Sequence, residues 1–207
     1  MAVVCGPKGA GKSTLARLLV NALQGATSGA VGFLDVDCGA PELTPPGLLS
    51  LSLLTRPLLG PPACRLSCGE TPQPRECRFV GDTSPAADPG AYAAAVAALL
   101  QAWAAQPEAH GAVPAPLVIN TLGWVRGLGL ELLCELLRGC GPTHVLQLRV
   151  PSAGSACGLP RGLFWSTLAD SVVTPTLCCV LEIAAAEPGG GEARHRDHDT
   201  SPPGSTR

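Results

Sequence analysis

The chain has 207 residues, ten cysteines and a formal net charge of -2 at pH 7. This length fits one α/β domain that can bury a sizeable core, and the near-neutral charge is weak evidence against nucleic-acid binding, since a local stripe of arginines can bind phosphates on a neutral protein. No basic start precedes an apolar run, so we expect no secretory leader, a reducing compartment, and cysteines that act as small buried hydrophobes.

The first predicted elements enclose a glycine-rich loop. Residues 1–5 are apolar and predict a short strand, and apolar residues at helical spacing over 15–23 predict a helix that Gly25 ends. The loop between them reads G-x-x-x-x-G-K-S, which predicts a P-loop that binds a nucleoside triphosphate through backbone N–H groups and a helix N-terminus. Its residues are Gly6, Pro7, Lys8, Gly9, Ala10, Gly11, Lys12, Ser13 and Thr14. Lys12 can reach the β- and γ-phosphates, and the Ser13 hydroxyl can ligate Mg²⁺.

A second apolar strand is predicted over residues 30–36, and two carboxylates, Asp35 and Asp37, stand at its end. At the carboxyl edge of a parallel sheet, where nucleotides bind, one carboxylate can hold the water shell of a metal and another can accept a proton from an attacking hydroxyl. The alternative is a simple Asp-Gly turn that leaves the strand. The position, one helix and one strand after the P-loop, favours the functional interpretation. A long loop is expected from there to Asp88.

The remaining predicted elements alternate between helix and strand. Asp88 and Pro89 predict the start of a helix, through a capping side chain and a proline in the first turn. Residues 117–119 predict a buried strand, 128–137 a helix and 144–150 another strand. This order predicts an α/β fold with a P-loop NTPase core, in which a parallel sheet carries helices on both faces.

The same order predicts how the chain is divided. Residues 1–150 form the P-loop core, and residues 151–186 form an irregular segment. Residues 187–207 hold almost nothing to bury, which predicts a disordered tail. His195 and His198 in that tail are interpreted as solvated side chains rather than as a metal-binding pair.

Two other features suggest sites that we do not favour. Cys64, Cys68 and Cys77 could be three zinc ligands, but no fourth ligand stands at a recognised spacing. The apolar stretches over residues 48–59 and 163–186 are interrupted by charged residues or are too short to span a membrane. We therefore expect neither a metal cluster nor a membrane segment.

Four motifs in register resemble those of the polynucleotide 5′-hydroxyl kinase family. They are Gly-Pro-Lys-x-x-Gly-Lys-Ser-Thr in the P-loop, Asp-x-Gly-x-x-Glu-x-Thr-Pro-Pro-Gly over residues 37–47, Gly-x-Thr-Ser-Pro over 81–85, and Ile-Asn-Thr-x-Gly-Trp-Val over 119–125. The Thr-Pro-Pro-Gly and the run that follows Asn-Thr are similar to the branch of the family that processes pre-ribosomal RNA in the nucleolus. The resemblance covers about residues 1–150 and leaves out the flanking domains of the family, so it implies a chain shortened at both ends.

The resemblance implies transfer of the ATP γ-phosphate to the 5′-hydroxyl end of RNA, with ATP and Mg²⁺ as cofactors. It also implies a location in the nucleus and nucleolus, and an endonuclease partner that creates such RNA ends. Catalysis would depend on Lys12 and Asp37, with Asp35 as the alternative carboxylate and Arg161 as the arginine of a partial lid over residues 151–186. Ser13 and Asp37 would hold the metal. The implied substrate contacts are Thr83, Ser84, Asn120, Thr121 and Trp124. Trp124 would stack on the terminal base, and its alternative is a place in the core.

Two departures from the family leave other functions open. Ala40 stands where the family usually has glutamine, and Arg161 is the only lid candidate, in a context that fits the family poorly. The alternatives are a catalytically impaired ATP-binding scaffold, the related kinase of messenger- and transfer-RNA processing, and a small-molecule kinase. A GTPase is excluded, because the chain has no third lysine with which to build a guanine reader of the Asn-Lys-x-Asp type.

Overall fold

A seven-stranded sheet in the order β4-β3-β2-β5-β1-β6-β7 forms the centre of the molecule. The computed structural model describes residues 1–27, 29–60, 72–110, 114–150, 159 and 179–184. The strands are β1 Ala2–Cys5, β2 Val31–Asp35, β3 Leu48–Leu54, β4 Glu76–Phe79, β5 Leu117–Asn120, β6 His144–Arg149 and β7 Cys179–Ala184. The helices in the described residues are α1 Lys12–Thr27, α3 Pro89–Ala104, α4 Pro107–His110 and α5 Leu128–Cys140. Strands β2, β5, β1, β6 and β7 run parallel to one another, whereas β3 is antiparallel to both of its neighbours.

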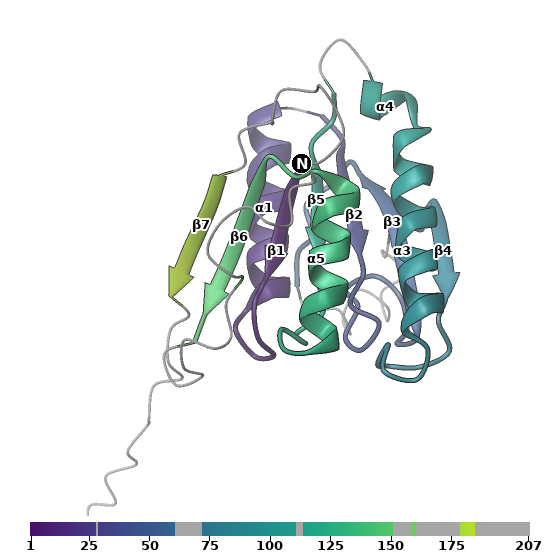
Figure 1. Cartoon of the computed structure of the whole chain (residues 1–207). Helices are drawn as coiled ribbons and strands as arrows, with labels where there is room; N and C mark the ends of the chain where they lie inside the picture. The colour runs from purple at the N-terminus through teal and green to yellow at the C-terminus, as the bar shows by residue number, and fades with distance from the viewer. Residues whose placement is uncertain (28, 61–71, 111–113, 151–158, 160–178, 185–207) are drawn as a thin grey trace, which may run out of the picture.

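Helices cover both faces of this sheet (Figure 1). α3 and α5 pack together over one face, in front in the view, and α1 lies behind the other face against β1, β2 and β5. Each face has its own buried apolar cluster: one includes Leu99 of α3 and Ile119 of β5, and the other includes Val20 of α1 and Phe33 of β2. Burial of both faces stabilises a parallel sheet, and the predicted α/β architecture is confirmed.

The long loop predicted between β2 and α3 is wrong, because it contains β3 and β4. β3 pairs antiparallel with β2 and then with β4. Ser50 and Ser52 of β3 are buried among leucines, with 0% and 1% of their surface exposed. Both faces of the strand are therefore covered, although Leu49-Ser50-Leu51-Ser52-Leu53 alternate between apolar and polar residues as a half-exposed strand does. The segment predicted to be irregular likewise contains β7, which pairs with β6.

The start of α3 and the end of α5 agree with the signals in the sequence, whereas the predicted end of α1 at Gly25 is wrong, because the helix continues through Gly25 to Thr27. The Asp88 side chain accepts a hydrogen bond from the Ala91 backbone N–H at 2.9 Å, and Pro89 is the first residue of α3. Gly141 ends α5 in the left-handed conformation, with φ 53°. Among the residues that the structure describes, no helix has the length and apolar character needed to cross a bilayer.

Four connecting segments meet at one edge of the sheet. The loops after β1, β2 and β5 leave the carboxyl ends of parallel strands. β4 runs in the same direction as β2, since each is antiparallel to β3, and so the loop after β4 leaves the same edge. This edge of a doubly wound sheet is where ligands bind.

Candidate active site

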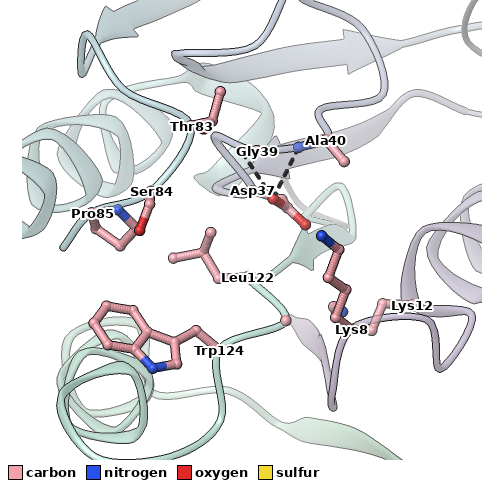
Figure 2. A pocket seen from close by; sticks show the side chains of 11 residues that line it. Lys8, Lys12, Asp37, Gly39, Ala40, Thr83, Ser84, Pro85, Leu122 and Trp124 are labelled. Carbon is pink, nitrogen blue, oxygen red and sulfur yellow. Dashed lines mark hydrogen bonds between the residues drawn. The ribbon is translucent and has the colours of Figure 1, made fainter.

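A cavity of about 370 Å³ opens at this edge and is lined by residues from all four loops (Figure 2). Its lining residues are Lys8, Lys12, Asp37, Gly39, Ala40, Thr83, Ser84, Pro85, Leu122, Gly123 and Trp124. In Figure 2 the two lysines and Asp37 stand on one side, and Trp124 and Pro85 stand on the other. The cavity thus has a charged half and an aromatic half.

The P-loop wraps around the start of α1. Gly9 and Gly11 have positive φ values of 80° and 88°, which let the backbone turn in a way that other residues rarely adopt. Lys12, the first residue of α1, is only 6% exposed, and its Nζ donates to the Pro7 carbonyl at 3.1 Å. Burial lowers the pKa of Lys12, and the nearby Asp37 opposes that shift. A polyphosphate would supply the negative charge that a buried ammonium group needs.

Asp37 presents one carboxylate oxygen to the cavity. Its Oδ1 accepts hydrogen bonds from the backbone N–H groups of Gly39 at 3.0 Å and Ala40 at 3.1 Å, shown as dashed lines in Figure 2. Within the described part of the chain, Oδ2 of Asp37 has no hydrogen-bond donor. The side chain is therefore held in place through one oxygen while the other is available to a metal, a water molecule or a hydroxyl.

Asp35, the alternative carboxylate, lies beneath the cavity rather than in its wall. It is 0% exposed, and burial raises its pKa to about 7. Its Oδ1 accepts from the Asn120 amide at 3.0 Å and from the Asp37 backbone N–H at 3.2 Å, and its Oδ2 accepts from the Glu42 backbone N–H at 2.7 Å. This geometry supports Asp37, and not Asp35, as the carboxylate that contacts a substrate.

Asn120 and Thr121, two of the predicted substrate contacts, are buried at the end of β5. Asn120 is 0% exposed and bonds to Asp35, while Thr121 is 3% exposed and its Oγ1 donates to the Val4 carbonyl at 2.9 Å. Neither lines the cavity. Their hydrogen bonds join the end of β5 to the ends of β2 and β1. They therefore stabilise the sheet edge at which the loops of the cavity begin.

The aromatic half of the cavity comes from the loops after β4 and β5. Trp124 is half-buried, and its ring contacts Gly129 at the start of α5. Thr83 is exposed and Ser84 is half-buried, and both line the cavity. Leu122, which the motifs did not single out, fills the space between Trp124 and the P-loop side (Figure 2). A half-buried tryptophan at a cavity wall is suited to stacking on a planar ring.

The oxygen donors near the P-loop fit a magnesium ion that accompanies a nucleotide. Ser13 lies in the first turn of α1 and Asp37 stands on the same side of the cavity as Lys12, and Mg²⁺ is commonly held by one or two protein oxygens together with substrate phosphates. In the described residues no group of three or more His, Cys, Asp or Glu side chains could hold a metal by itself. Cys77 is an exposed free thiol, and Cys64, Cys68 and the lid candidate Arg161 lie outside the described residues.

Comparisons with known proteins identify the family of the chain. Residues 6–153 match the family described as the mRNA cleavage and polyadenylation factor CLP1 P-loop. The chain is 40% identical over 167 residues to polynucleotide 5′-hydroxyl-kinase NOL9 of Arabidopsis thaliana, a match that covers 80% of this chain and 44% of that protein. It is 37% identical over 147 residues to the Homo sapiens protein of the same name, covering 71% of this chain and 19% of the relative.

Solved structures support the fold. The chain of the wild-type Clp1p–Pcf11p complex superposes with a TM-score of 0.63 over 90% of this chain, at 14% sequence identity, and the match covers 44% of that chain. A second Clp1p chain, from a structure of an extended interface between Pcf11p and Clp1p, gives a TM-score of 0.59 over 73% of this chain, at 15% identity. The present chain therefore spans less than half the length of these relatives.

Proposed function

This chain belongs to the CLP1 P-loop family, and within that family we propose that it is an ATP-dependent polynucleotide 5′-hydroxyl kinase that phosphorylates the 5′-hydroxyl end of RNA. One observation carries the proposal. The cavity joins a buried lysine and a carboxylate, which suit phosphoryl transfer, to a tryptophan that suits a nucleic-acid base. The names of the similar proteins in Arabidopsis thaliana and Homo sapiens support the same reaction.

In the proposed reaction the 5′-hydroxyl oxygen forms a bond to the γ-phosphorus, and the bond from that phosphorus to the β–γ bridging oxygen breaks. Asp37 Oδ2 accepts the hydroxyl proton, and the products are ADP and a 5′-phosphate end. Lys12 and the backbone of the P-loop hold the phosphates. Ser13 would hold Mg²⁺ directly and Asp37 would hold it through the water shell of the metal, and the ion would neutralise phosphate charge. Trp124 positions the acceptor by stacking on its terminal base.

We also propose a biological setting for this reaction, in pre-ribosomal RNA processing in the nucleolus beside an endonuclease partner. The NOL9 name of the relatives supports the nucleolar location, and the Clp1p chains, which are bound to Pcf11p, support the expectation of a protein partner. The related kinase of messenger- and transfer-RNA processing remains the alternative within the family.

A second candidate is an ATP-binding scaffold with impaired transfer. Ala40 supports it, because this side chain lines the cavity beside Asp37 and contributes only a methyl group. A scaffold would keep the P-loop contacts to ATP and lose the contacts that activate the acceptor. The two candidates therefore differ in transfer and not in nucleotide binding.

Transfer of labelled γ-phosphate from ATP to a 5′-hydroxyl RNA oligonucleotide tests the proposal. We expect labelling by the native chain, loss of labelling in Lys12→Ala, and retention in Arg56→Ala, which removes an exposed basic side chain far from the P-loop in sequence. A nucleoside acceptor in parallel tests for a small-molecule kinase. ATP binding without any labelling would refute the kinase and support the scaffold.

A further inference from the structure

Gly129, the second residue of α5, lies directly against the tryptophan of the cavity wall. A Cβ atom at Gly129 would lie 2.3 Å from Cγ, 2.5 Å from Cδ2 and 2.4 Å from the carbonyl oxygen of Trp124. Ordinary carbon contacts begin at about 3.5 Å, so no side chain larger than a hydrogen atom fits at this position while Trp124 stays where it is.

The backbone conformation of Gly129 does not explain the glycine. Gly129 lies within α5 and has no positive φ, so alanine could adopt the same conformation and would favour the helix more. The three heavy atoms nearest to a Cβ atom at this position all belong to Trp124. The close approach of that residue is therefore the physical reason for a glycine here.

The chain between the two residues is held in a shape that brings α5 back onto the tryptophan. Val125 is 7% exposed and belongs to the buried cluster beneath α3 and α5. The Gly129 N–H donates to the Arg126 carbonyl at 3.1 Å, and the Leu130 N–H donates to the Gly127 carbonyl at 3.0 Å. These contacts fix the turn from the cavity wall into the helix.

Little space remains on the helix side of the indole. A cavity of only about 10 Å³ lies there, lined by Trp124 and by residues that include Tyr92, Leu132 and Leu136. That volume is at most about the space that one water molecule needs, so the indole cannot retreat into it. The other side of Trp124 faces the large cavity, across from the two lysines (Figure 2).

We propose that Gly129 is a positioning residue for the RNA acceptor: because it has no side chain, it lets Trp124 stand as a preformed wall on which the terminal base stacks. The inference rests on the proposed kinase function, in which Trp124 holds the acceptor. A preformed wall needs no rearrangement when RNA binds, so little of the stacking free energy is spent on ordering it. Gly129 should affect the acceptor and not ATP, because the atoms nearest to it are not those of the P-loop.

Gly129→Ala tests the inference, and Gly139→Ala is the matched control. The control makes the same change in the same helix, where a Cβ atom would meet Leu100 Cδ1 at an ordinary 3.8 Å. In an equilibrium titration we expect a 5′-hydroxyl RNA trinucleotide to bind roughly fivefold more weakly, or worse, to Gly129→Ala, with Trp124→Ala as the limit. The KM for RNA should rise in parallel, while the Kd for ATP changes by less than about threefold. The control should bind both ligands as the native chain does.

The double variant Gly129→Ala with Trp124→Ala separates positioning from a general loss of stability. If Gly129 acts through the indole, the added alanine should weaken RNA binding no further than Trp124→Ala does alone. A purely structural effect of the alanine would weaken RNA binding again in the double variant. That second loss would overturn the inference, as would native RNA affinity in Gly129→Ala.

The native chain provides an independent test that holds even if Gly129→Ala does not fold. Nuclear Overhauser contacts between the Gly129 Hα protons and the Trp124 indole should be present in the free chain and should persist when the trinucleotide binds. Their absence from the free chain, or their loss on binding, would overturn the inference, because the wall would then not be preformed.

The failure of the proposed function is distinguishable from the failure of this inference. If the native chain binds RNA, and Gly129→Ala loses that binding, but no phosphate is transferred, then the kinase function alone fails and the positioning role stands. A native chain that binds RNA no better than Trp124→Ala would overturn the positioning role, since no stacking would then depend on the indole.

Discussion

Replacing Gly123 by alanine tests how closely the loop after β5 packs on the P-loop. Gly123 lines the cavity and has no positive φ, so alanine can adopt its backbone conformation. A Cβ atom there would lie 2.8 Å from the Cα and 2.9 Å from the N of Lys8, and 3.1 Å from the Nζ of Lys12. The lysine head can swing away, but the Lys8 backbone can move only if the whole P-loop moves.

The size of the effect follows from these distances. Ordinary carbon contacts begin at about 3.5 Å, so the P-loop or the loop after β5 must shift by several tenths of an ångström. Overpacking of this kind costs typically about 1–3 kcal/mol. Because 1.4 kcal/mol is a factor of ten in affinity, this cost corresponds to ATP binding that is weaker by roughly fivefold to 150-fold. Any part of the cost that reduces folding stability instead lowers the melting temperature and reduces the loss of affinity.

Calorimetric titration with ATP, together with thermal unfolding, measures both parts of this effect. Gly25→Ala is the matched control, since a Cβ at Gly25 meets nothing within 4 Å and alanine should stabilise α1 by about 0.5–1 kcal/mol. The reasoning is refuted if Gly123→Ala binds ATP within about threefold of the native chain and melts at the same temperature.

Three further predictions concern side chains in or beneath the cavity. Trp124→Ala should weaken RNA binding by roughly 1–3 kcal/mol in an equilibrium titration and leave ATP binding nearly intact, whereas equal loss of both would indicate a folding defect. Asp37→Asn keeps an oxygen for Gly39 and Ala40 but cannot take a proton, so kcat for transfer should fall by about 10²–10⁴-fold; an unchanged kcat would contradict its role as base. Burial raises the pKa of Asp35 from 3.8 to about 7. Between these pH values the native state keeps a proton on Asp35 that the unfolded chain releases, so the stability that this proton contributes is lost as pH rises through about 7. Urea unfolding with EDTA should therefore show a decline between about pH 4 and 7 that Asp35→Asn flattens, and equal slopes would contradict the assignment.

The sequence predicted those parts of the site whose functional residues stand close together in the chain. The P-loop needs its glycines and lysine at fixed spacing, and Asp37 follows its strand directly, so a short window of sequence contains the whole argument. Thr83, Ser84 and Trp124 line the cavity. Local motifs were therefore sufficient to find these residues, but they missed Leu122 and included Asn120 and Thr121, which do not line the cavity.

The sequence could not separate those residues from the ones that support them. Asp35 and Asp37 have the same chemistry and stand two residues apart, but only the first meets the Asn120 amide from another strand. The strand β3 was missed although leucine and serine alternate over residues 49–53, a pattern typical of a strand. Its pairing with β2 and β4 and the burial of both serines depend on contacts between distant segments, which that pattern does not report.

The same distinction bears on Ala40, where the resembling kinases usually have glutamine. Its backbone N–H donates to Asp37, and that bond does not depend on which side chain stands at this position. Gly39 donates a second backbone bond, and Asp35 fixes the ends of the segment that carries Asp37 through two more. The placement of Asp37 is therefore preserved with alanine, and what is absent is a polar side chain in the cavity wall. Any loss of transfer at this site would come from weaker contact with the reacting groups, while the carboxylate that accepts the proton remains in place.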